Sequence, residues 1–127
     1  MKTYVLDTNI FLRFNLQDNV KQFNTAKEYF LQAQKQVIRL VCYTETLLEL
    51  EYVLRKVYKY QKFIIAQYIS AILDMDYITV IERKVLKNAI PIYRNKNIDL
   101  VDLVIHFKAL EINAEVLSFD KDFKKLV

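Results

Sequence analysis

Short apolar runs alternate along this chain with longer stretches in which apolar residues recur every three or four positions. An unbroken run of roughly four to eight apolar residues is typical of a buried strand, whereas the longer spacing is typical of a helix with one buried face. The runs predict strands at residues 3–6, 37–42, 77–81 and 115–119. The helical spacing predicts helices at residues 8–14, 20–36, 44–60, 62–73, from 83 onward and 100–112, and a short turn at 122–126.

The order of these elements predicts the fold class. Strands separated by helices cannot pair as hairpins, so they pair in parallel through right-handed crossovers that place helices on both faces of a sheet. We expect one domain over residues 1–127, a three-layer α/β/α sandwich with a central, mainly parallel sheet of four to five strands. Ligand sites in such sheets form beyond the carboxyl ends of the strands.

The chain contains no glycine and a single proline. Positive φ angles must therefore be supplied by other residues, and Asn19, Asn97 and Asn113 are the expected substitutes. We expect Thr44 to cap its helix, and Pro91 to kink its helix or end it early. Without glycine, neither a Walker loop nor a dinucleotide-binding fingerprint can be written, so enzymes of those types are excluded.

Composition places the protein in a reducing, aqueous compartment. Cys42 is the one cysteine, so neither an internal disulfide nor a cysteine-based zinc site is possible. No apolar stretch approaches the roughly 18 residues of a membrane span, and the apolar run before Asp7 is too short for a signal-peptide core. We expect a cytoplasmic protein without a membrane association.

The net charge is +4, and the basic residues gather in groups. A single group is most simply a solvated helix face, but several together favour contact with nucleic acid. The groups are Arg55, Lys56, Lys59 and Lys62; Arg83, Lys84 and Lys87; Arg94 and Lys96; and Lys121, Lys124 and Lys125.

Four acidic residues stand in apolar surroundings. Asp7 ends the first expected strand and Asp120 the fourth, while Glu49 and Asp102 interrupt apolar helical stretches. A carboxylate among core-forming residues loses its hydration unless a cation or several donors replace it. We therefore expect these acids to converge on a metal ion.

Each acid also has a simpler interpretation. Asp7 can cap the following helix, Asp102 can complement a helix dipole, and Asp120 can form a surface turn with Asp122. Glu49 lies away from the apolar stripe of its helix and Glu51 nearer the stripe's edge, so the helical wheel does not choose between them. His106, one turn after Asp102, is interpreted as a packed or partly exposed helix residue.

Four motifs, in order, resemble the PIN domain family and in particular VapC-type toxins of toxin–antitoxin pairs. They are VLDTN at residues 5–9, ELEYVLR at 49–55, IDLVD at 98–102 and LSFDKDF at 117–123. The resemblance covers almost the whole chain. It implies an acidic site of Asp7, Glu49, Asp102 and Asp120, selecting Glu49 over Glu51. It also implies support from Asn9 and Ser118, with Asp99 and Asp122 as secondary ligands or outer groups.

The resemblance implies an endoribonuclease whose carboxylates bind a hard cation. Carboxylate oxygens favour Mg²⁺ or Mn²⁺, which would activate water for attack on an RNA phosphodiester. Implied partners are RNA, such as tRNA or rRNA, a protein antitoxin and a second copy in a homodimer. The alternatives are a housekeeping RNA-processing nuclease of the same fold and a non-catalytic RNA-binding or scaffold domain. A phosphoacceptor receiver domain is disfavoured, because the first strand is followed by one acid and not a pair.

Overall fold

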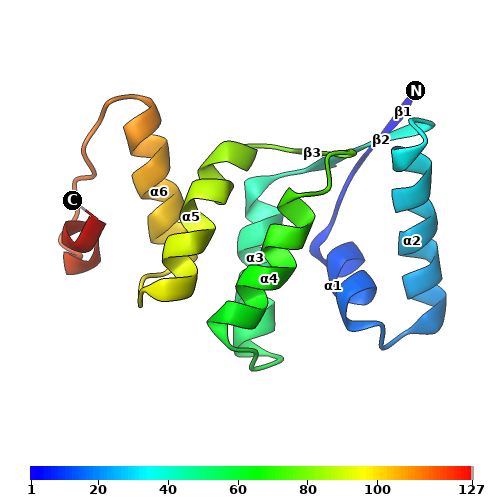
Figure 1. The fold of residues 1–127 in the computed structure, drawn as a ribbon, viewed down its shortest axis with the longest axis horizontal. Helices are drawn as coiled ribbons and strands as arrows, with labels where there is room; N and C mark the ends of the chain where they lie inside the picture. Colours follow the sequence, from blue (N-terminus) through cyan, green and yellow to red (C-terminus); the bar gives the residue numbers. More distant parts are fainter. Residues whose placement is uncertain (127) are drawn as a thin grey trace.

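The computed structural model describes residues 1–126, in which helices alternate with three short strands (Figure 1). The strands are β1 (Lys2–Val5), β2 (Ile38–Cys42) and β3 (Ile78–Val80). The helices are α1 (Thr8–Leu16), α2 (Val20–Gln34), α3 (Thr44–Lys56), α4 (Lys62–Leu73), α5 (Arg83–Asn95) and α6 (Leu100–Glu111), followed by the 3₁₀ helix η1 (Lys121–Leu126).

The three strands form one parallel sheet in the order β1-β2-β3, which confirms the predicted α/β class. Lys2 lies opposite Ile38 in the first pair of strands, and Leu40 lies opposite Ile78 in the second. Helices α3, α4, α5 and α6 pack in succession, each against the next. As a result the N-terminus and the end of η1 lie at opposite ends of the long axis of the molecule (Figure 1).

Apolar side chains on the predicted helix faces form the core. Leu47, Leu50 and Leu54 of α3 are fully buried, as their spacing predicts. Phe14 packs against the rings of Phe23 and Phe30, which fastens α1 to α2. None of the helices within residues 1–126 is both long and apolar enough to cross a bilayer.

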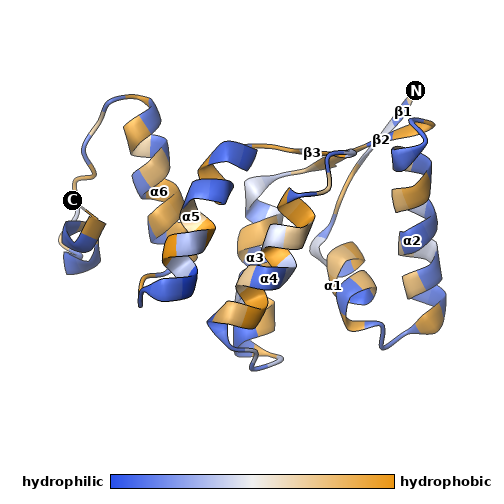
Figure 2. Cartoon of the chain, in the orientation of Figure 1, coloured by the Kyte–Doolittle hydropathy of each residue, from blue (hydrophilic) through white to orange (hydrophobic). Residues whose placement is uncertain are grey.

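The predicted fourth strand, residues 115–119, is wrong for this structure. Within residues 1–126 the sheet has three strands rather than four or five, and residues 115–119 form no ladder. The segment runs beyond α6 at the outer end of the molecule (Figure 2), and its Leu117 and Phe119 side chains are exposed. The physical reason is position: packing of α6 on α5 carries this segment away from β1.

The local backbone also differs from expectation at several points. Asn113 does take a positive φ, but the other such positions are Gln17, Gln36, Lys59 and Glu82, not Asn19 or Asn97. Asn19 instead caps α2 through its side chain, with φ of −134°. The N-cap of α3 is Tyr43, and Thr44 is the first helical residue.

Pro91 neither ends nor shortens its helix. Helix α5 continues through it to Asn95. Because Pro91 is exposed, the Lys87 carbonyl that loses its helical donor faces the solvent side, where water can satisfy it.

Candidate metal centre

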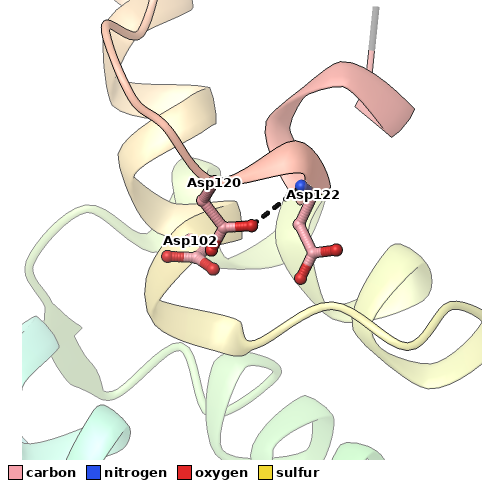
Figure 3. Close-up of side chains that lie close together, drawn as sticks. All are labelled: Asp102, Asp120 and Asp122. Carbon is pink, nitrogen blue, oxygen red and sulfur yellow. Dashed lines mark hydrogen bonds between the residues drawn. The ribbon is translucent and has the colours of Figure 1, made fainter.

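Three carboxylates from two parts of the chain meet at the outer face of α6. Asp102 lies in the first turn of α6, Asp120 directly precedes η1, and Asp122 lies in its first turn. One oxygen from each carboxyl group lies within 4.8 Å of the corresponding oxygens of the other two (Figure 3). Three acidic oxygens at this spacing can share one cation.

Hydrogen bonds between residues two apart in sequence hold Asp120 and Asp122, two acids that follow α6. The Asp120 amide donates to Ser118 Oγ at 2.9 Å. The Asp122 amide donates to Asp120 Oδ1 at 2.9 Å, as the dashed line in Figure 3 marks. Asp122 also pairs with Lys125, at 2.9 Å. Ser118 is therefore hydrogen-bonded to the backbone of the acidic cluster.

Electrostatics at the cluster favour a positive partner. Burial raises the pKa of Asp102, and the negative charges of Asp120, Asp99 and Asp122 raise it further. Asp99 thus acts on the cluster through its charge while its own side chain is exposed. A divalent cation would remove this repulsion.

Asp7 and Glu49 are not part of the cluster in the described chain. Asp7 is exposed and caps α1, with its Oδ2 accepting a bond from the Asn9 amide at 3.4 Å. Glu49 is exposed on α3. Of the four acids expected to converge, the structure brings Asp102 and Asp120 together, adds Asp122, and leaves Asp7 and Glu49 elsewhere.

Asp7 and Glu49 nevertheless share a region at the carboxyl end of β1. The Thr46 hydroxyl of α3 donates to the Leu6 carbonyl at 3.3 Å, and the Thr8 hydroxyl donates to the Thr46 carbonyl at 3.4 Å. Asp7 lies between the two residues bonded to Thr46, and Glu49 follows Thr46 by one helical turn. The predicted acids therefore form two groups, one beside β1 and one beside α6.

Glu51 is the acid that sequence reasoning passed over. It is 6% exposed, and its carboxylate accepts bonds from Arg55 Nε at 2.7 Å and from the Tyr93 hydroxyl at 2.6 Å. Lys62 lies over the Tyr93 ring, 4.6 Å from its centroid. The position of Glu51 near the edge of the apolar stripe was the signal for this burial. Its partners make it a structural link between α3 and α5 rather than an open ligand.

A hollow of about 480 Å³ adjoins the cluster between α6 and the residues that follow it. His106, Ser118 and Asp120 contribute to its polar side, and Leu110, Val116 and Phe123 to its apolar side. The His106 ring packs edge-on against Phe107, which agrees with a packed helix residue.

The acidic cluster offers only oxygen ligands, which are the ligands that suit a hard cation. The chain belongs to the PIN domain family, whose sequence model matches residues 4–127. It is similar to a protein named VapC ribonuclease from Aquifex aeolicus (strain VF5), with 28% identity over 123 residues, 96% of this chain and 90% of that protein. No solved structure matches the chain significantly.

Proposed function

We propose that this protein is a metal-dependent endoribonuclease and the toxin of a toxin–antitoxin pair. Membership of the PIN domain family and the similarity to a VapC ribonuclease support the proposal. The observation that carries it is the meeting of Asp102, Asp120 and Asp122 within 4.8 Å of one another. We further propose that it acts in the cytoplasm as a homodimer.

The donor set fits Mg²⁺ or Mn²⁺. All three groups offer oxygen, and Cys42, the one thiol, is fully buried in the core. Oxygen ligands of this kind favour hard cations over zinc. Asp102, Asp120 and Asp122 would hold the ion. Asp7 and Glu49 are assigned to the same site by the family resemblance, although they lie apart from this cluster within the described chain.

When bound, the ion supplies a water of lowered pKa and neutralises charge that develops on the phosphate oxygens. The carboxylates act as ligands and water-positioning groups, not as nucleophiles. Asn9 would support them through its backbone N–H, which donates to the Asp7 carboxylate, and Ser118 through its hydroxyl, which accepts from the Asp120 amide.

Basic side chains near the cluster are available for the RNA backbone. Arg55 is paired with Glu51, and Arg83 donates to the carbonyls of Leu73, Met75 and Ile78, so these two serve the fold. Lys121 and Lys124 are exposed beside Asp120 and Asp122. We propose that these lysines contact phosphates, while Asp122 and Lys125 hold the end of η1 in place.

Cleavage of RNA by the purified protein tests the nuclease. We expect activity with Mg²⁺ or Mn²⁺, none with EDTA, and a loss of about 100-fold or more in Asp102→Asn and Asp120→Asn. Glu111→Gln is the matched control, since Glu111 is an exposed acid of α6 outside the cluster. Equal activity in all three variants would contradict the proposal.

Asp7→Asn separates catalysis from folding. We expect this variant to lose cleavage while its stability without metal does not fall, because asparagine can also cap a helix. A variant that fails to fold would assign Asp7 to the structure of α1 instead.

Expression in cells distinguishes a toxin from a housekeeping nuclease. We expect growth arrest on induction, relieved by a small antitoxin that covers the acidic cluster and inserts a basic side chain. Sequencing the ends of total RNA after brief induction would identify the cut site, with tRNA or rRNA as the expected substrate. Harmless accumulation of active enzyme would oppose the toxin role.

A further inference from the structure

Residues 115–119 leave apolar side chains without cover. Leu117 is 102% exposed and Phe119 is 107% exposed, as in an isolated extended chain. Ser118 lies between them, so Leu117 and Phe119 would point to the same face of an extended strand. Within residues 1–126 this segment pairs with no strand of its own chain.

The edge of the sheet at β1 suits such a strand. β1 pairs only with β2, and its Val5 is 61% exposed. The other edge strand, β3, has Ile78 at 1% and Val80 at 7% exposure, so it offers no exposed apolar side chains at these positions to a further strand. An exposed strand edge with apolar side chains is a template for pairing with another strand.

In a parallel alignment of residues 115–119 with β1, opposite charges face each other and apolar residues face apolar residues. Placing Asp120 beside Asp7 sets Glu115 opposite Lys2, so opposite charges meet at the start of the two strands. The same alignment puts Leu117 opposite Tyr4 and Phe119 opposite Leu6. Leu6 is buried and Tyr4 packs against Tyr29, so Leu117 and Phe119 would lie on the core side of the sheet.

The segment cannot reach β1 of its own chain while α6 stays on α5. Leu100, Leu103 and Val104 bury α6 against its neighbours, and the segment lies at the far end of the molecule from β1 (Figure 1). A second copy can approach without breaking this contact. Val101 and Ile105 of α6 are also exposed, at 48% and 44%, and are available to a second copy.

We propose that two copies of this chain exchange residues 115–119, each segment adding a parallel strand to β1 of the other copy. Parallel strands end at the same edge of a sheet, so Asp120 of one copy arrives beside Asp7 of the other. Each acidic site is then shared: one copy supplies Asp7 and Glu49, and its partner supplies Asp102, Asp120 and Asp122. The strand exchange rests on the exposed surfaces, and its catalytic consequence rests on the proposed function.

Disulfide trapping tests the exchange without any assay of activity. In the proposed alignment Val5 lies opposite Ser118, so chains carrying Val5→Cys and differently tagged chains carrying Ser118→Cys should form a covalent dimer bearing both tags under mild oxidation. Val5→Cys mixed with Glu111→Cys is the control and should remain uncoupled. A double variant, Val5→Cys with Ser118→Cys, should also give dimers. Monomers with an internal disulfide, or no coupling, would overturn the exchange.

Complementation then tests the shared site. Asp7→Asn and Asp120→Asn chains, co-expressed with different tags and purified through both, should recover about half of the wild-type activity, because one of the two sites in each mixed dimer is intact. Asp7→Asn combined with Glu49→Gln should recover none, since both changes fall in the same half of the site. If the wild type is inactive, the proposed function fails while the trapping result still decides the exchange. If the wild type is active and the first pair stays inactive, the shared site is wrong.

Discussion

Glu51 is the one charged residue among residues 1–126 that is buried, and its carboxylate depends on two donors. Arg55 supplies a charged bond from the same helix, and the Tyr93 hydroxyl supplies a neutral bond from α5. Burial raises the pKa of Tyr93 and the bond to Glu51 raises it further, so the hydroxyl keeps its proton and remains a donor. A buried carboxylate that lost such a donor would be left partly unsatisfied.

Tyr93→Phe should therefore lower the free energy of unfolding by about 1–3 kcal/mol, with the loss assigned to the missing hydrogen bond. Denaturation by urea, followed by circular dichroism, measures it. Tyr52→Phe, at a tyrosine that is 54% exposed, is the matched control and should change stability little. Equal effects of the two changes would mean that the hydroxyl of Tyr93 contributes nothing to stability.

Backbone conformation in a chain without glycine gives a second prediction at this scale. Gln36 follows α2 with φ of 62°, a region that costs most residues about 1–2 kcal/mol. Gln36→Gly should raise stability by about 0.5–1 kcal/mol, after allowing for the greater freedom of glycine in the unfolded chain.

Gln34→Gly, two residues earlier, provides the contrast. Gln34 is the last residue of α2, so glycine there should lower stability by up to about 1 kcal/mol. Thermal unfolding of both variants decides the matter, and a loss of stability in Gln36→Gly would refute the argument from positive φ.

At the scale of elements, Glu82 connects three helices. It precedes α5, pairs with Lys108 of α6 at 2.7 Å and accepts a bond from the Thr44 hydroxyl of α3. Lys108 holds the pKa of Glu82 below its ordinary value of 4.5, and the Thr44 bond lowers it further. The charged form of Glu82 is thus favoured by folding.

A carboxyl group with a lowered pKa stabilises the fold above its unfolded pKa, and this contribution disappears as the pH falls through the folded pKa. Glu82→Gln should therefore be less stable than the wild type at neutral pH, and the difference should shrink below about pH 4.5. Urea titrations of both proteins from pH 3 to 7 would measure it, with pH values set on the order of one unit apart. A difference independent of pH would exclude the Glu82 charge as its source.

The elements also show what sequence can and cannot predict. The helices α3, α4 and α6 begin where their patterns predicted, at Thr44, Lys62 and Leu100, because local spacing and burial agree there. Residues 115–119 have an equally clear strand pattern, but a strand needs a partner, and the partner depends on the path of α6. Asp102 and Asp120 meet because both belong to the same end of the chain, whereas Asp7 depends on contacts far away in sequence.

At the scale of the whole molecule, the acidic cluster forms a negatively charged region on a protein whose net charge is positive. The net charge is +4, yet Asp102, Asp120 and Asp122 concentrate negative charge at one end of it. That concentration costs stability, because burial and neighbouring charges raise the pKa of Asp102. A ligand that binds only the folded chain offsets this loss, because its binding raises the free energy of unfolding.

Mg²⁺ or Mn²⁺ should therefore raise the melting temperature of the wild type, with a gain of about 2.7 kcal/mol when the ion is present at 100 times its dissociation constant. Asp102→Asn should be at least as stable as the wild type without metal, because the variant removes a repelling charge, and it should respond less to the ion. Glu111→Gln, outside the cluster, should respond as the wild type does. Scanning calorimetry with and without EDTA measures both effects. An equal response in Asp102→Asn would show that the ion stabilises the protein from some other place, since the acids of α6 and η1 would then have no part in holding it.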